Sequence, residues 1–349
     1  MIDPYNRTID YLRISVTDRC NVRCIYCMPP EGIDAKGREE MLRYEEIERV
    51  VREFVHLGVT RFRITGGEPL VRKGITGLIQ DLAGLEGVKD LSLTTNGLLL
   101  DRYARELKQA GLRRVNVSLD SLKSERYHHI TRGGDFHQVL RGIHHALEVG
   151  LHPVKLNVVV IREVNDDEVL DFVELARSLP VWVRFIEFMP MGEDNFWSPQ
   201  RLVSSEEVKA YVLRHYPLEP LPPPVSEGPS AWEPGLPSPF PSEIFSMVGN
   251  GPASYYRTPG AAGWVGFIGS MTRHSCHRCN RLRLTAEGRL RSCLLADEET
   301  DLRGALREGG SPEELRRLIE RAVRAKPPGH SLSSSGHAHA RGQMSAIGG

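Results

Sequence analysis

The stretch of residues 10–27 reads DYLRISVTDRCNVRCIYC. Its first part, 10–16, alternates aliphatic and polar residues, which is typical of a β-strand. Three cysteines, Cys20, Cys24 and Cys27, follow this expected strand with the spacing C-x3-C-x2-C. A loop with such short spacing lets three thiolates converge on one face of an iron–sulfur cube. The stretch therefore predicts a strand that ends at a metal site.

A strand–helix pattern continues outward from this stretch to about residue 190. Further strands are expected at 61–65, 89–94, 113–119, 154–161 and 181–188, with helices at 44–57, 101–110, 136–149 and 166–178. Asn165 is the expected N-cap of the last helix. Alternating strands and helices favour an α/β fold with a parallel sheet, and right-handed crossovers curl six such units into an incomplete TIM-like (β/α)6 barrel. An open doubly wound sheet is the alternative.

The pattern changes after residue 190. Residues 204–207 (SSEE) form a capping box for a helix that reaches about Tyr216, and ten prolines at 217–241 predict an insertion or an extended loop. Later elements are expected as strands at 244–248, 264–268, 282–284 and 289–293, with a turn at Glu287-Gly288, and as a helix that starts at Ser311.

Three regions follow from this organisation. We expect a barrel domain over 1–200, and a C-terminal extension of strands and helices over 201–330 that carries the insertion and a second metal cluster. A flexible tail over 331–349 ends in Gly348-Gly349.

Composition narrows the class of protein. The chain has 349 residues, 40% of them hydrophobic, which is enough for a sizeable core. Its 45 Lys and Arg balance 45 Asp and Glu, so the basic excess of a general nucleic-acid binder is missing. The start, MIDPYNR, lacks the apolar segment of a secretory signal, and the aliphatic run 158–161 is far too short to cross a membrane. We expect a cytoplasmic protein with no nucleic-acid or membrane partner.

All six cysteines lie in two triads, the second being Cys276, Cys279 and Cys293. In a large cytosolic chain, close cysteine spacing indicates metal binding before disulfide bonding. Three cysteines leave one iron of a [4Fe–4S] cluster open to a small molecule. Two structural zinc sites are the alternative, and His274 or His277 would then complete the second one.

The first triad, with Tyr26 before its last cysteine, resembles the radical S-adenosylmethionine (SAM) superfamily. Members of that superfamily split SAM reductively into methionine and a 5′-deoxyadenosyl radical. In parallel barrels the chemistry sits at the C-terminal ends of strands. Polar or glycine-rich signals stand at four such ends: TGGEP (65–69), TTNG (94–97), SLD (118–120) and EFM (187–189).

Several cations are expected to point into the barrel. Arg281 and Arg283 share one face of their strand, and Arg13, Arg63 and Lys155 lie on three others. Two guanidinium groups beside a cluster with an open iron suit a polyphosphate. An inward-facing arginine needs an anionic partner. A solvent-exposed face is the alternative for any one of these residues.

Together the motifs resemble the GTP 3′,8-cyclase family of molybdenum cofactor biosynthesis, over nearly the whole chain. They are the first triad, RITGGEPL (63–70), LTTNG (93–97), NVSLDS (116–121), RFIEFM (184–189), CNRLRL (279–284) with its single later cysteine, and the Gly-Gly end. The proline-rich stretch departs from the family because it is longer than expected.

The resemblance implies roles for individual residues. Two [4Fe–4S] clusters are implied, the SAM-binding one on Cys20, Cys24 and Cys27 and the other, which takes the guanine end of GTP, on Cys276, Cys279 and Cys293. Positions that match SAM contacts are Tyr26, Gly67, Ser118 and Met189. Positions that match GTP contacts are Arg13, Arg63, Thr94, Lys155, Arg281 and Arg283. Catalytic roles fall on Arg13, Arg281, Arg283, Gly348 and Gly349, since this family's tail is thought to insert its two glycines into the active site.

The resemblance also implies a reaction and partners. The deoxyadenosyl radical removes the ribose 3′ hydrogen of GTP, C3′ attacks C8 of guanine, and one electron and one proton complete 3′,8-cyclo-7,8-dihydro-GTP. This lyase reaction is the first step towards molybdopterin. The implied partners are a reductant protein such as flavodoxin or ferredoxin, and a downstream enzyme that converts the cyclic nucleotide to the pterin. A homodimer is one option for the assembly.

Two other functions stay open. One is a radical SAM enzyme that modifies peptides and carries an auxiliary cluster, although such enzymes usually need more cysteines than the three left over here. The other is a non-catalytic iron–sulfur or zinc module, which four-cysteine ligation would favour.

Overall fold

The computed structural model describes residues 1–34, 36–191, 196–221, 251–330 and residue 347. Its strands form one curved sheet with the order β12-β11-β10-β1-β2-β3-β4-β5-β6-β9-β8-β7. Neighbours from β10 through β1 and β6 to β9 pair in parallel. The parallel strands are β1 (Tyr11–Ser15), β2 (Arg61–Thr65), β3 (Asp90–Thr95), β4 (Arg114–Ser118), β5 (Val154–Val160), β6 (Val181–Glu187), β9 (Trp264–Ile268) and β10 (Arg281–Leu284).

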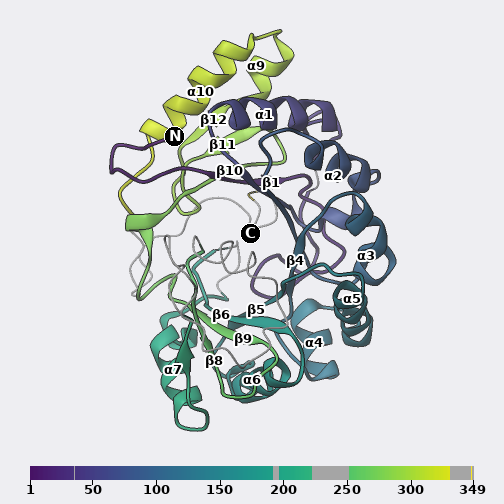
Figure 1. Ribbon diagram of the computed structural model, residues 1–349, viewed down its shortest axis with the longest axis vertical. Coiled ribbons are helices and arrows are strands. Elements are labelled where there is room, and N and C mark those ends of the chain that lie inside the picture. Colours follow the sequence, from purple (N-terminus) through teal and green to yellow (C-terminus); the bar gives the residue numbers. More distant parts are fainter. Residues whose placement is uncertain (35, 192–195, 222–250, 331–346, 348–349) are drawn as a thin grey trace, which may run out of the picture.

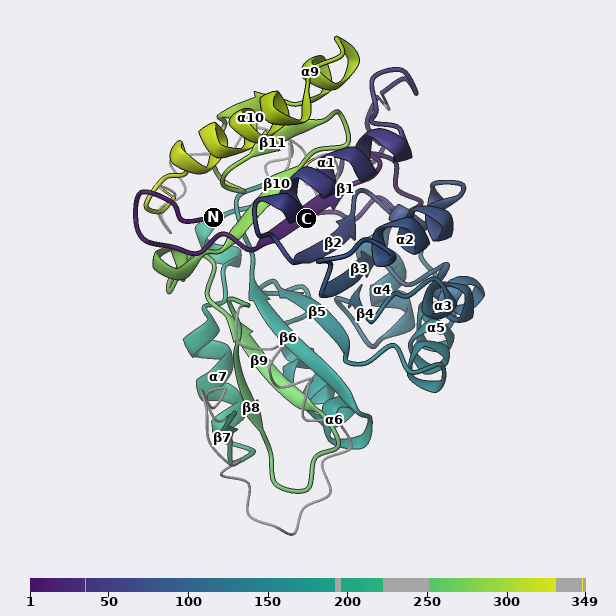
Figure 2. The same ribbon diagram turned by 45° about the horizontal axis from the view of Figure 1, so that its top comes forward.

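Antiparallel strands finish both edges of the sheet. They are β11 (Arg289–Arg291) and β12 (Glu299–Asp301) beyond β10, and β8 (Ser254–Arg257) and β7 (Glu219–Pro220) beyond β9. Figure 2 shows β8 and β9 beside β6. Because the strand order has two ends within the described residues, the barrel is incomplete.

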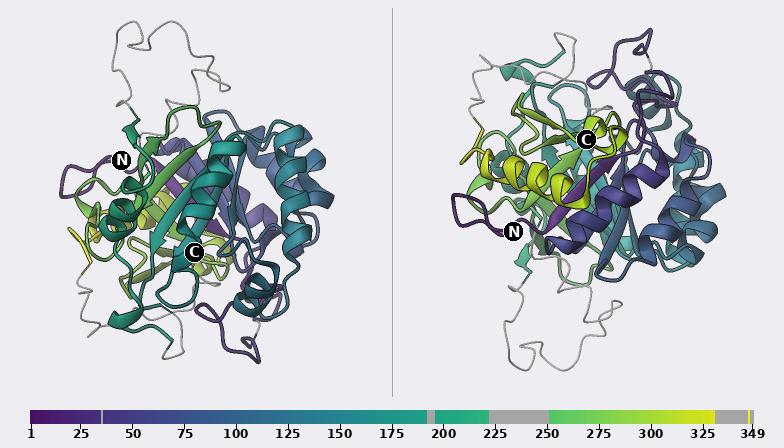
Figure 3. Two further views of the ribbon diagram at one scale, coloured as in Figure 1. Left: turned by 90° about the horizontal axis from the view of Figure 1, so that it is seen from below. Right: turned by 90° about the horizontal axis from the view of Figure 1, so that it is seen from above.

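Helices cover the outer face of the curved sheet (Figure 1). They are α1 (Tyr44–His56), α2 (Ile75–Ala83), α3 (Leu100–Gln109), α4 (Ser124–Thr131), α5 (Phe136–Glu148), α6 (Val169–Ser178), α7 (Ser205–Leu213), α9 (Arg303–Arg307) and α10 (Pro312–Arg324). Figure 3 shows α10 alongside α1, so the C-terminal region packs on the start of the barrel. No helix in the described part of the chain is long and apolar enough to cross a membrane.

The main core lies between the sheet and these helices. Leu12 and Ile14 of β1 are fully buried in one cluster with Ile47 and Val50 of α1. The spacing of Ile47 and Val50 places them on one helical face. Because successive side chains of a strand point to opposite faces, Arg13 points to the inside of the curve. The barrel thus has an apolar outer layer and a cationic interior.

The expected incomplete α/β barrel is confirmed. Its helices lie along the outer face of the sheet (Figure 1), whereas a doubly wound sheet would have helices on both faces. The expected strand bounds at 61–65 and 264–268 agree with β2 and β9. Ser204 caps α7 as expected, since its Oγ accepts a hydrogen bond from the Glu207 N–H at 3.1 Å. That helix ends at Leu213, three residues before the expected end.

Other details differ from the sequence analysis. Asn165 stands before a 3-10 turn at Asp166–Glu168 and makes no capping bond. Its amide instead accepts from the Ile161 N–H at 2.8 Å and donates to the Asp120 carbonyl at 2.7 Å. The sequence analysis did not foresee α2, α4 or α9. The expected strand at 244–248 and most of the insertion at 217–241 lie outside the described residues.

One buried ion pair joins the starts of β3 and β4. The Arg114 Nε donates to the Asp90 Oδ1 at 3.1 Å, and a second bond joins its Nη2 to Oδ2. Burial raises the pKa of Asp90, but Arg114 outweighs it and the net pKa is lowered. A lowered folded-state pKa means that the pair stabilises the protein above the unfolded pKa of about 3.9 and that this contribution is lost as the pH falls through the folded-state value.

We expect Asp90→Asn to lower the free energy of unfolding of the metal-free, full-length chain by about 3–5 kcal/mol, because it leaves the Arg114 charge buried without its partner. Urea unfolding followed by circular dichroism measures the change. The control is Asp167→Asn, which breaks an exposed pair with Arg126 and should cost less than about 1 kcal/mol. An equal decrease in the free energy of unfolding in both variants would contradict the larger contribution of the buried pair to stability.

Candidate active site

The first cysteine triad lies on the loop that follows β1. Burial raises the pKa of Cys24 well above its usual value, as do Cys27, Asp120 and Cys20 nearby, and burial with the Cys20 and Asp120 charges raises the pKa of Cys27 to about 12. Burial also raises the pKa of Cys20, so the thiols of this half-buried triad stay protonated until a metal replaces their protons. The donor set fits an iron–sulfur cluster with three protein ligands.

Two arginines, one within this loop and one at the end of α4, hold its backbone. The Arg23 guanidinium donates to the Cys20 carbonyl at 2.6 Å, and Arg132, at the end of α4, donates to the Met28 carbonyl at 2.7 Å. These bonds fix the backbone on both sides of the triad, so the positions of the thiols do not depend on a metal alone.

The Gly66-Gly67 turn after β2 packs against the approach to the same loop. A Cβ on Gly67 would lie 2.3 Å from the Arg19 carbonyl oxygen, and a Cβ on Gly66 would lie 2.5 Å from that of Thr17. The Gly67 N–H donates to the Thr17 carbonyl at 2.7 Å. The structure thus gives these glycines a reason in backbone packing, in addition to any approach to a ligand.

Glu68, in the same motif, is a buried carboxylate that organises the next strand end. It accepts hydrogen bonds from the Leu70 N–H at 3.0 Å, the Thr95 hydroxyl at 2.8 Å and the Asn96 N–H at 2.7 Å. Burial raises its pKa to about 7. The Asn96 amide in turn lies 3.8 Å from the Cys20 Sγ. Glu68 therefore links the TGGEP and TTNG motifs to the first triad.

Tyr26 is fixed by a carboxylate that the sequence analysis did not single out. Its hydroxyl donates to the Asp120 Oδ2 at 2.5 Å, and the Val159 N–H donates to Oδ1 at 2.9 Å. Its ring meets that of Phe188 edge to face, with centroids 6.2 Å apart. Burial raises the pKa of Asp120 to about 6. The sequence signal was present, because Asp120 ends the SLD motif after β4.

A cavity of about 220 Å³ opens on the inside of the sheet. Of the expected site residues it brings together Arg13, Arg63, Arg281, Arg283, Met189, Cys276, Cys279 and Cys293. Tyr26, Gly67, Thr94, Ser118 and Lys155 are not among its lining residues. Gly348 and Gly349 lie outside the described residues. Within the described chain, then, the second triad and the four expected arginines share one cavity.

Strand register explains how three of these arginines meet. Arg13 of β1 pairs with Arg283 of β10 on one side and with Arg63 of β2 on the other. We call Arg283, Arg13 and Arg63 the arginine row. Burial lowers the pKa of Arg13 well below its ordinary value, and Arg283 and Arg63 lower it further, while burial lowers the pKa of Arg63 to about 10. Such a row of like charges, with Arg283 buried and Arg13 and Arg63 half-buried, favours a multiply charged anion.

Lys155 and Arg184 extend the positive charge along β5 and β6. Burial lowers the pKa of Lys155, whose Nζ lies 4.8 Å from the centre of the Trp182 ring. Arg184 lines the cavity, and its guanidinium donates to the Asn116 Oδ1 at 2.7 Å. Arg184 was not predicted as a site residue. Its position inside the apolar run VWVRFIEF could have indicated an arginine that points into the barrel.

The second triad lies at the cavity wall. Cys276 and Cys279 precede β10 in the sequence, and Cys293 follows β11. Burial raises the pKa of Cys279, but Arg281 and Lys326 outweigh it and lower the pKa to about 6. The Lys326 Nζ donates to the carbonyls of Arg281 at 2.9 Å and Ser292 at 2.5 Å. A thiolate stabilised by two cations is a ready metal ligand, so this triad also fits a cluster.

Residue 347, close to the end of the chain, lies inside the barrel. Ile347 is 3% exposed and forms a cluster with Met191. Met189, Leu294 and Leu295 pack on this cluster, and all three line the cavity. The chain therefore approaches the cavity just before its two terminal glycines.

Comparisons with known proteins show the family of this chain. The Radical SAM superfamily model matches residues 14–176, and the Molybdenum Cofactor Synthesis C model matches residues 241–332. The solved structure of Streptococcus suis SuiB matches with a TM-score of 0.47 and 17% identity over 60% of this chain and 48% of its own, a likeness too weak to add to the argument.

Full-length relatives decide the family. The GTP 3′,8-cyclase of Pelotomaculum thermopropionicum is 50% identical over 349 residues, which is 100% of both chains. That of Moorella thermoacetica is 48% identical over 334 residues, 96% of each chain. With this identity along its whole length, and with both family models matched in order, the chain belongs to the GTP 3′,8-cyclase family of radical SAM enzymes.

Proposed function

We propose that this chain converts GTP to 3′,8-cyclo-7,8-dihydro-GTP, the first step of molybdopterin and molybdenum cofactor biosynthesis, by radical SAM chemistry inside its barrel. The observation that carries the proposal is the arginine row beside the second cysteine triad in one cavity. A triphosphate carries negative charge that complements the row, and the second triad lines the same cavity. The family membership disfavours both the peptide-modifying enzyme and the non-catalytic module.

The first triad and its neighbours bind SAM in this proposal. Cys20, Cys24 and Cys27 hold a [4Fe–4S] cluster, which when bound supplies the electron that cleaves SAM. Tyr26, Gly67, Ser118 and Met189 are the proposed SAM contacts. Tyr26 is oriented by Asp120, and the Gly67 backbone is tied to Thr17, so both are positioned before SAM arrives.

The arginines and the second triad bind GTP. Arg13, Arg63, Arg281 and Arg283 take the phosphates, with Thr94 and Lys155 further along the sheet. Cys276, Cys279 and Cys293 hold a second [4Fe–4S] cluster, whose open iron when bound serves as a Lewis acid for the guanine. Charge-assisted bonds from several guanidinium groups orient the ribose and keep water from a reactive radical.

The tail completes the cavity in this proposal. Buried Ile347 anchors the chain among Met189, Met191 and Leu294, so Gly348 and Gly349 can extend among the arginines. Glycine has no side chain, and the terminal carboxylate is a suitable partner for a guanidinium group.

Other expectations remain predictions. They are a reductant protein such as flavodoxin or ferredoxin, a downstream enzyme that makes the pterin, a cytoplasmic location and a homodimer. The division into 1–200, 201–330 and 331–349 also remains a prediction.

The first test concerns the cofactors. Anaerobic reconstitution of the full chain should give about eight irons per chain, as two four-iron clusters. Replacing Cys279 and Cys293 together by Ser should leave about four irons and SAM cleavage but no cyclised product. Stoichiometric zinc with a single cluster in the unaltered chain would contradict the two-cluster proposal.

The second test concerns the phosphates. Arg283→Ala should weaken GTP binding about tenfold or more, because it removes charge-assisted contacts worth roughly 1.5–3 kcal/mol. Anaerobic calorimetry with GTP measures this, and iron content checks that both clusters remain. The control is Arg278→Ala, since Arg278 is an exposed arginine of the same segment that does not line this cavity. Unchanged affinity in Arg283→Ala would exclude the row as the phosphate site.

The third test concerns the tail. A chain that ends at Ile347 should keep both clusters and much of its GTP affinity, whereas its cyclised product should fall sharply even if SAM is still cleaved. Product analysis after anaerobic turnover, with cleaved SAM counted in parallel, separates the two steps. Full cyclase turnover in the shortened chain would contradict a role for Gly348 and Gly349.

A further inference from the structure

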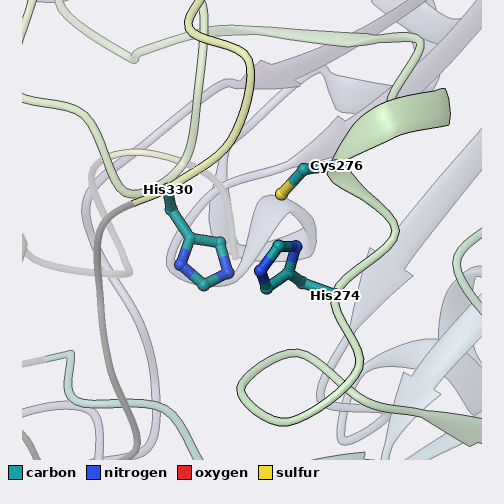
Figure 4. A group of neighbouring side chains, drawn as sticks. All are labelled: His274, Cys276 and His330. Atoms are coloured by element: carbon teal, nitrogen blue, oxygen red, sulfur yellow. The ribbon is translucent and has the colours of Figure 1, made fainter.

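Two histidines stand beside one cysteine of the second triad. Figure 4 shows the imidazoles of His274 and His330 next to Cys276. One candidate ligand atom from each of the three residues lies within 4.8 Å of the other two. His274 and Cys276 belong to the loop before β10, whereas His330 lies beyond α10, so two segments distant in sequence meet here.

The spacing of these atoms suits a single metal ion. Metal–sulfur bonds of about 2.3 Å and metal–nitrogen bonds of about 2.0 Å place tetrahedral zinc ligands roughly 3.3–3.8 Å apart. The 4.8 Å limit on the present separations exceeds this spacing by about 1 Å, so metal binding would draw the side chains slightly closer. A mixed set of imidazole and thiolate is also the donor set that zinc prefers.

A hydrogen bond holds the ring of His330. Its Nε2 lies 3.1 Å from the Ser270 carbonyl oxygen. Figure 4 shows the same nitrogen turned towards His274. Because a carbonyl only accepts, Nε2 carries a proton in the metal-free chain, and a metal ion bound at this nitrogen would displace that proton. The His274 and His330 rings already meet, with centroids 4.5 Å apart.

A buried arginine joins the two segments that carry the ligands. The Arg7 guanidinium donates to the carbonyl of Cys276 at 2.8 Å and to those of Pro327 at 2.6 Å and Pro328 at 3.0 Å. Asp3 holds Arg7 in turn, at 2.5 Å. The three ligand residues are therefore brought together by contacts that need no metal, which lowers the entropy cost of binding one.

We propose that His274, Cys276 and His330 form a mononuclear site for a divalent transition-metal ion of the zinc type, and that this site competes with the second iron–sulfur cluster for Cys276. The competition rests on the proposed function, whereas the site itself does not. His274 is exposed, so an ion can enter from solvent. The fourth position faces the cavity that all three residues line. The ion cross-links the loop before β10 to the segment after α10 in the cluster-free chain.

Cobalt titration of the metal-free, full-length protein tests the site. One Co²⁺ should bind with intense tetrahedral bands and a thiolate charge-transfer band. His274→Ala and His330→Gln should each weaken binding at least about tenfold. The glutamine keeps an N–H for the Ser270 carbonyl and so guards against misfolding. The control is His277→Ala, which should bind like the unaltered chain because His277 is exposed and outside the group. Absence of the thiolate band, or full affinity in both histidine variants, overturns the site.

Iron uptake tests the competition. Chain loaded with one Zn²⁺ should take up about four irons on anaerobic reconstitution, against about eight for zinc-free chain. Equal uptake with and without zinc overturns the competition. The zinc-free chain is the control that separates the competition from the proposed function. If the zinc-free chain takes up only about four irons, both the two-cluster proposal and the competition are contradicted. The cobalt titration decides the metal site in either case.

Discussion

Repulsion between the arginines inside the barrel governs how the rest of the site is organised. Strand register places Arg283, Arg13 and Arg63 side by side, and each neighbour makes the Arg13 charge harder to keep. The outer faces of the same strands, with Leu12 and Ile14, contribute the apolar burial that offsets this cost. A fold stabilised on its outside can therefore tolerate several like charges inside the barrel.

Buried carboxylates at the strand ends have a different role from the arginine row. They accept hydrogen bonds from the loops that follow the strands and so fix the positions of those loops. Glu68 bonds the end of β3, and Asp120 bonds β5 and Tyr26. Glu187, at the end of β6, accepts from the N–H groups of Ser205 at 2.7 Å and Met271 at 2.7 Å. The bond from the Met271 N–H holds the segment that leads to the second triad. These carboxylates accept hydrogen bonds mainly from backbone N–H groups. They therefore do not neutralise the arginines, and the cavity keeps its positive potential.

Sequence patterns predicted what is local and missed what depends on distant contacts. The alternation in 10–16 predicted that Arg13 turns away from the core, and RLRL did the same for Arg283. The α2 helix was missed because it is only nine residues long and contains Gly77. Nothing local indicated that β10 would pair with β1 or that His330 would lie beside Cys276. Such contacts arise from tertiary packing, and only the family resemblance suggested that the distant segments share one site.

The parallel pairing of β10 with β1 has a consequence for synthesis on the ribosome. Tyr11 is paired with Arg281, about 270 residues later in the chain. At roughly 5–20 residues per second, the edge of β1 waits on the order of 15–50 s for its partner. During that time it presents free backbone groups and the charged Arg13 side chain. Charge at an unpaired strand edge disfavours pairing with other chains, so a residue that costs stability in the finished barrel has the opposite value in the growing one.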